Sequence, residues 1–269
     1  MLSSELEIAL LVLAFYGSTC VAMVFANEGV LARVSRGLRL QVADDRVRIA
    51  GRSPIWLNPF TPMFPAFRGQ WGNADAIAAS PGLPARVAEA MRASEVLTPY
   101  VFAVFLYAII GIPLALLWGG AVRALPIVAL AYLAALVMLL RLWFLRDAFS
   151  LGRGKFALLA FESLVCLPFS AGVVRRLSLL VPVHEDLASF TVDMSAEARE
   201  QALATLMERC DEMTGFHAEA SAEFSRLTQY RAHLSLLAGE TSGAAGPDAA
   251  SSVALVVDAG QRSAMEKVD

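Results

Sequence analysis

The sequence has little charge and almost no lysine. Asp, Glu, Lys and Arg make up 17% of its 269 residues and hydrophobic residues 57%, whereas soluble domains carry about 25% charged residues. Lys155 and Lys267 are its lysines, so arginine supplies nearly all of the positive charge. This scarcity of charge argues against an ordinary soluble domain and predicts a chain that lipid covers in part. The formal net charge of -3 does not favour a nucleic-acid partner, and we expect none.

Cysteine and histidine are also scarce. The cysteines are Cys20, Cys166 and Cys210, and the histidines are His184, His217 and His233. Cysteines that are odd in number and far apart predict neither a disulfide framework nor a metal knuckle. The histidines have no metalloprotease spacing and no cysteine at ligand distance, so we expect no metal site.

Motifs of catalysis are absent from the sequence. It contains no Gly-rich phosphate loop, no G-x-S-x-G elbow and no kinase signature. The two long apolar runs Tyr100 to Trp118 and Leu125 to Leu140 contain no histidine that could hold haem. We therefore expect no enzymatic activity and no cofactor.

Long apolar runs predict an all-α integral membrane protein with three transmembrane helices, and a further apolar run is the candidate for a fourth. The first run, Ile8 to Ala26 (segment 1–26), carries no charge and is followed by arginines, which places its end in the cytoplasm and the amino terminus outside. The runs Tyr100 to Trp118 and Leu125 to Leu140 form a hairpin (98–145) around Gly119 to Ala124. Arginines after this hairpin predict a cytoplasmic carboxyl terminus in a bacterial inner membrane.

The fourth apolar run, Phe156 to Val174, contains Glu162 and Pro168 and has basic residues at both ends. The favourable insertion free energy of its apolar side chains is roughly equal to the cost of inserting one central charge, so the net free energy of insertion is close to zero. We expect segment 146–182 to be interfacial or re-entrant rather than a full span. If it spans, Glu162 is a candidate ion-coupling residue, and its candidate partners are Arg141, Arg146 and Arg175.

Small residues recur at every fourth position in two of the predicted spans and predict close helix packing. These residues are Ala14, Ser18 and Ala22 in the first, and Gly111, Ala115 and Gly119 in the second.

The remaining segments are predicted to be cytoplasmic. Segment 27–97 contains "LRLQVADDRVRIA", whose alternation predicts a short β-hairpin around Ala43-Asp44-Asp45, followed by a segment rich in proline and aromatic residues that suits an irregular loop or a lipid or partner contact. Segment 183–240 is predicted helical, with a coiled-coil-like stripe that can pack within the chain or on a second copy; Thr214-Gly215 can split it. We expect 241–269 to be a flexible tail. The residues that we predict to contact a second copy or a partner protein are Leu203, Met213, Phe224, Leu227 and Leu234.

A short part of the chain resembles the RDD family of small membrane proteins. The matching residues, in "FLRDAFSLGRGKFALLAF" and the later "VVRR", are Arg146, Asp147, Gly154, Lys155 and Arg176. The acidic residue that this family carries in its first span has no counterpart between Ile8 and Ala26, and we transfer no function from the resemblance.

These observations predict a non-catalytic integral membrane protein. We expect a scaffold or accessory subunit of a membrane complex, with other membrane proteins or a second copy as its partners. The alternative is a small transporter or ion-coupled carrier that uses Glu162.

Overall fold

The computed structural model describes residues 4–34, 37–43, 47–74, 77, 83–218 and 221–243. The chain divides into two compact units, Met1–Ala202 and Leu203–Asp269. Helices predominate, but the first unit also contains strands in two sheets. The prediction of an all-α fold is therefore wrong.

The first predicted span is instead a shorter helix followed by a strand. Helix α1 covers Ser4–Ser18, and β1 covers Val21–Val24. The hydroxyl groups of Ser18 and Thr19 donate to the carbonyl oxygens of Phe15 and Tyr16, at the end of the helix. The 15 described residues of α1 reach about 22 Å, less than the roughly 30 Å of a bilayer core.

Two antiparallel sheets follow α1. In one, β2 (Glu28–Val34) lies between β3 (Gly37–Val42) and β5 (Ala66–Gln70); in the other, β1 pairs with β4 (Ser53–Trp56). The turn of the β-hairpin predicted around Ala43-Asp44-Asp45 falls largely outside the described residues; among them, β3 pairs with β2, the strand before it. Residues 44–46 lie outside the described residues.

Each face of the larger sheet has apolar neighbours. On one face, Val30 and Ala66 join a core with Val24, Ile55 and Leu57. On the other, Gly29 and Gly69 are register partners. A Cβ on either would lie within 3 Å of the Leu187 side chain, so only glycine lets Leu187 pack this closely.

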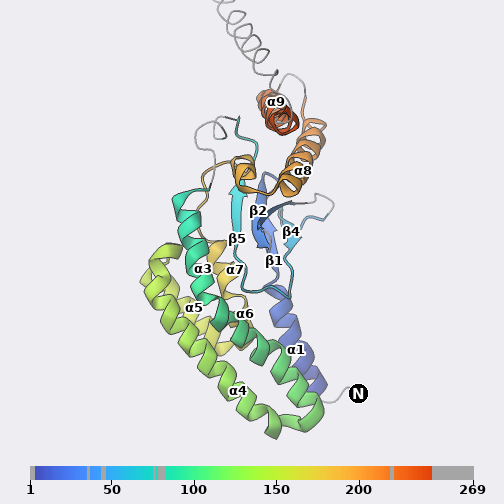
Figure 1. Cartoon of the computed structure of the whole chain (residues 1–269). Helices are drawn as coiled ribbons and strands as arrows, with labels where there is room; N and C mark the ends of the chain where they lie inside the picture. Colours follow the sequence, from blue (N-terminus) through green and yellow to red (C-terminus); the bar gives the residue numbers. More distant parts are fainter. Residues whose placement is uncertain are drawn as a thin grey trace, which may run out of the picture. The chain divides into compact units, whose positions relative to one another are not determined.

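A bent helical hairpin forms the next layer (Figure 1). It consists of α3 (Ala85–Val104), the π-helix η1 (Phe105–Gly111), α4 (Ile112–Leu145) and the 3-10 turn η2 (Arg146–Phe149). Gly120, with φ 70° and ψ -175°, interrupts α4 within the turn predicted at Gly119 to Ala124. The two arms approach closely: a Cβ on Gly111 would lie 2.9 Å from Ile127 Cγ2.

Ala85–Phe149 is the one helix among the described residues that is long and apolar enough to cross a membrane. The prediction of three or four transmembrane helices is therefore wrong. The fourth apolar run is broken into α5 (Arg153–Val165), α6 (Leu167–Ala171) and α7 (Val173–Ser178). Cys166 leaves the helical conformation directly before α6, which has Pro168 in its first turn.

The first unit continues through the 3-10 helix η3 (Leu187–Asp193), whose start is capped by the Asp186 carboxylate. Helix α8 (Ala196–Thr214) contains the boundary between the units. In the second unit α8 and α9 (Ala222–Gly243) form a helical hairpin. Asp211 accepts hydrogen bonds from Arg231, and the Cys210 thiol donates to the Leu227 carbonyl oxygen, across this hairpin.

Candidate functional site

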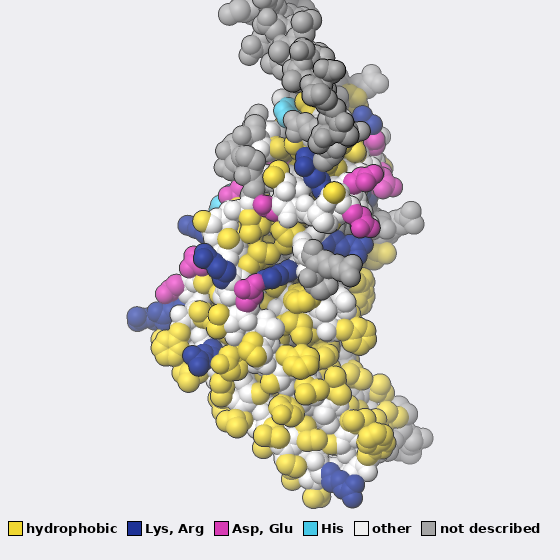
Figure 2. All heavy atoms as spheres, in the orientation of Figure 1, with side chains coloured by type: hydrophobic (Ala, Val, Ile, Leu, Met, Phe, Trp, Pro, Cys, Tyr) yellow, Lys and Arg dark blue, Asp and Glu magenta, His cyan; other side chains and the backbone are white. Residues whose placement is uncertain are grey.

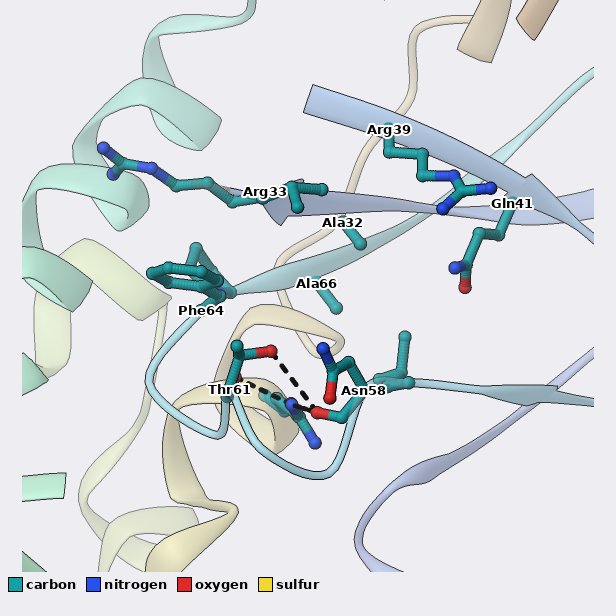
Figure 3. A pocket seen from close by; sticks show the side chains of 12 residues that line it. Ala32, Arg33, Arg39, Gln41, Asn58, Thr61, Phe64 and Ala66 are labelled. Carbon is teal, nitrogen blue, oxygen red and sulfur yellow. Dashed lines mark hydrogen bonds between the residues drawn. The ribbon is translucent and has the colours of Figure 1, made fainter. Parts of the chain in front are cut away.

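A cavity of about 350 Å³ lies in the first unit, between the larger sheet, the loop before β5, and α7 (Figure 3). Its walls come from segments far apart in the sequence. The lining residues are Ala32, Arg33, Val34, Arg39, Gln41, Leu57, Asn58, Thr61, Phe64, Pro65, Ala66 and Arg175.

The sheet wall combines small and long side chains. Ala32 is the register partner of both Arg39 and Ala66, so these three side chains share one face of the sheet. Gln41 lies two residues after Arg39 and has the same orientation. The alanine methyl groups leave space that Arg39 and Gln41 border (Figure 3).

Arg175 holds the opposite wall in place. Arg175 is 2% exposed; its Nη2 donates to the Thr61 carbonyl oxygen at 2.7 Å and to that of Asn58, while Nη1 lies 3.4 Å from Cys20 Sγ. The loop is also tied to α1, because the Tyr16 hydroxyl donates to the Pro59 carbonyl oxygen. Burial raises the pKa of Tyr16 well above its ordinary value. Cys20 also raises this pKa, whereas the positive charge of Arg175 lowers it.

The lining carries three arginines and no carboxylate. Of these three, Arg33 is the one that forms an ion pair with a described residue, since its Nη1 lies 2.5 Å from Glu95 Oε1. Among the described residues Gln41 Oε1 is buried and has no hydrogen-bond partner. Because an amide can be rotated to exchange its O and N atoms, Gln41 can either accept or donate toward a ligand. The cavity is therefore suited to a small anion.

Glu162 is paired with an arginine outside the predicted set. Its carboxylate accepts a hydrogen bond from Arg176, and both side chains are about one-third exposed. Arg175 faces the loop at 58–61, Arg146 lies 3.5 Å from Asp147 and stacks on Trp143, and Arg141 is exposed. The structure thus gathers none of the three candidate partners around Glu162.

The predicted packing residues have mixed surroundings. Ala14 and Ser18 are exposed on α1, while Ala22 is buried in β1. In the hairpin, Gly111 makes the close approach to Ile127, and Ala115 and Gly119 are half-buried.

The stripe predicted for partner contact is largely used inside the chain. Leu203, Leu227 and Leu234 are buried, whereas Met213 and Phe224 are half-buried. The split predicted at Thr214-Gly215 coincides with the end of α8.

Comparisons with family models, curated proteins and solved structures found no match to this chain. The cavity residues Arg39, Gln41 and Asn58 were not predicted as a site. The alternation in "LRLQV" indicated that Arg39 and Gln41 share a strand face, but no local signal joins them to Arg175.

Proposed function

We propose that this chain is a non-catalytic membrane-anchored protein that acts as a scaffold or accessory subunit of a membrane complex. The observation that carries this proposal is the apolar surface of the helices in the first unit. Over these helices Figure 2 shows mainly hydrophobic side chains, whereas charged groups gather near the sheets.

Exposed apolar side chains occur on several helices of the first unit. They include Leu10, Leu11 and Leu13 on α1, Leu133, Leu136 and Leu140 on α4, and Leu158, Phe161 and Val165 on α5. Monomeric soluble proteins seldom leave such an extended apolar surface in water. Lipid removes this surface from water, at roughly 25 cal/mol for each Å² covered.

The hairpin Ala85–Phe149 offers the segment for insertion, since it is the described helix long and apolar enough to cross a bilayer. Its exposed face carries large apolar residues on both sides of Gly120. We assign the sheets and the α8–α9 hairpin to the aqueous side, where their charged side chains stay hydrated.

The membrane part of the proposal is tested by alkaline carbonate extraction and by flotation with liposomes. We expect the full chain to remain in the membrane pellet and to float with the vesicles. Complete release by carbonate, together with a monodisperse protein in buffer without detergent, would overturn the proposal.

The accessory role is tested by site-specific photo-crosslinking in cells. Phe216, in the connection between α8 and α9, is a large exposed apolar residue of the second unit. A photoreactive residue there should give one discrete adduct with a membrane protein or with a second copy. Thr228, exposed on α9, is the matched control position and should give none. Equal adducts at both positions, or none at either, would contradict the role.

A further inference from the structure

We propose that the arginine-lined cavity of the first unit binds a phosphate-type anion, either the headgroup of an anionic lipid or a free phosphate. This inference goes beyond membrane anchoring, and only a lipid headgroup as the ligand rests on the proposed insertion. It assigns a ligand class to a site that membrane insertion alone does not require.

The first argument is the charge of Arg175. Its guanidinium is almost fully buried and has no carboxylate partner among the described residues; carbonyl oxygens and a thiol are its neighbours. Removing an ion from water without a counter-charge is costly. An anion in the adjoining cavity supplies that counter-charge.

The second argument is the set of groups left for a ligand. Arg39 is exposed at the rim and makes no ion pair with the described residues, whereas the Arg33 side chain points away from Arg39 and Gln41 and pairs with Glu95 (Figure 3). Arginine matches the geometry of phosphate oxygens through paired N–H donors. Gln41 Oε1, which is buried without a partner among the described residues, can accept a hydrogen bond from a ligand hydroxyl, and with the amide rotated its NH₂ group can donate to a phosphate oxygen.

The third argument is the position of the cavity beside exposed rings at the end of β4 and in the loop that follows it. Trp56 is 70% exposed and Phe60 78% exposed, and between them Leu57 and Asn58 line the cavity. The same loop is bound to the end of α1 through Tyr16 and Pro59. Aromatic rings favour the headgroup level of a bilayer, so a lipid phosphate can reach these arginines if the apolar helices are inserted.

The experiment measures ligand-induced shifts of the thermal midpoint of the full-length protein in nanodiscs. One arm adds inorganic phosphate to nanodiscs of phosphatidylcholine. The other replaces part of the phosphatidylcholine with phosphatidylglycerol. The test variant is Arg39→Gln, and the control is Arg92→Gln, which removes the same charge from an exposed position on α3 outside the cavity. A second variant, Gln41→Leu, keeps every charge.

A shift in the first arm identifies free phosphate as a ligand, and a shift in the second arm alone identifies a lipid headgroup. In either case we expect Arg39→Gln to weaken binding about tenfold, as the loss of one charge-assisted hydrogen bond predicts. Gln41→Leu should also weaken it, and Arg92→Gln should leave it within about twofold, because an exposed charge is screened. No shift in either arm, or equal responses of the Arg39→Gln and Arg92→Gln variants, would overturn the assignment. If the protein proves soluble, the phosphate arm is run in buffer, so failure of anchoring and failure of the cavity remain distinguishable.

Discussion

Arg175 and Arg176 are adjacent arginines in α7 with different surroundings. Arg175 is buried and donates to two loop carbonyl oxygens, whereas Arg176 pairs with Glu162 where both side chains are about one-third exposed. We expect Arg175→Met to lower the free energy of unfolding by about 2 kcal/mol, because unsatisfied buried acceptors cost about 1 to 3 kcal/mol each and relief of the buried charge offsets part of this.

Arg176→Met is the matched control, since it removes the same group one residue later. It should cost at most about 1 kcal/mol, the usual range for a solvent-accessible ion pair. Denaturant titration of both variants in one detergent measures the difference. Equal losses would show that Arg175 does not hold the loop.

Cys210 gives a dependence of stability on pH in the second unit. Burial, and next the negative charge of Asp211, raise the pKa of its thiol to about 11 from 9.0. Between these values the unfolded chain releases a proton that the folded chain keeps, so the contribution to stability is complete below about pH 9 and is lost as the pH rises toward 11. Peptide-resolved alkylation should therefore show Cys210 reacting slowly in the folded protein at pH 9 and rapidly after denaturation.

The control for this effect is Cys210→Ala. This variant should lose less stability than the parent chain between pH 9 and pH 11, because the titrating thiol is gone. An alkylation rate at pH 9 that is equal in folded and denatured protein would contradict the shifted pKa.

At the scale of elements, Gly120 controls the reversal of the long helix. Its φ of 70° and ψ of -175° belong to a region that essentially only glycine adopts, at a cost of about 1 to 3 kcal/mol for other residues. Gly120→Ala should lower the free energy of unfolding by that amount, measured by denaturant titration in detergent. Ala121→Ser, at an exposed neighbouring position, should change the free energy of unfolding by less than about 0.5 kcal/mol. Similar losses in both variants would show that a side chain at position 120 does not strain the backbone.

Local signals predicted some elements correctly. The turn at Gly119 to Ala124 contains Gly120, and the end of α8 falls at Thr214, because glycine ends regular helices through its backbone freedom. An apolar run alone cannot distinguish a spanning helix from a short helix followed by a buried strand. Val21–Val24 is a strand because it pairs with β4, which lies about thirty residues later in the sequence. No local sequence pattern reveals this pairing.

The cavity was beyond sequence reasoning for the same physical reason. Arg39 and Gln41 come from a strand, Asn58 and Thr61 from an irregular loop, and Arg175 from a helix that follows the hairpin. Their proximity results from tertiary packing, including Ser178 Oγ, which accepts a hydrogen bond from the Ala66 amide. The spacing of these residues in the sequence does not indicate such contacts.

At the scale of the whole molecule, an arginine placed on the apolar surface distinguishes lipid from water around it. Leu133 is 58% exposed on α4, in the helix that is apolar enough to span. In lipid, Leu133→Arg should cost about 2.5 to 3.5 kcal/mol of insertion free energy, and the fraction resistant to carbonate extraction should fall. In water the same change would alter stability by less than about 0.5 kcal/mol and would improve solubility.

Val192→Arg is the matched control for this prediction. Val192 is 51% exposed and lies in η3, which is close to the sheets through the contact of Leu187 with Gly29 and Gly69. This position belongs to the part of the first unit that we assign to the aqueous side, so the new charge should leave membrane retention unchanged. Because both variants add the same group at similar exposure, a selective loss for Leu133→Arg can arise only from the medium around α4. Equal retention of the two variants would mean that the apolar face of the hairpin is covered by something other than lipid.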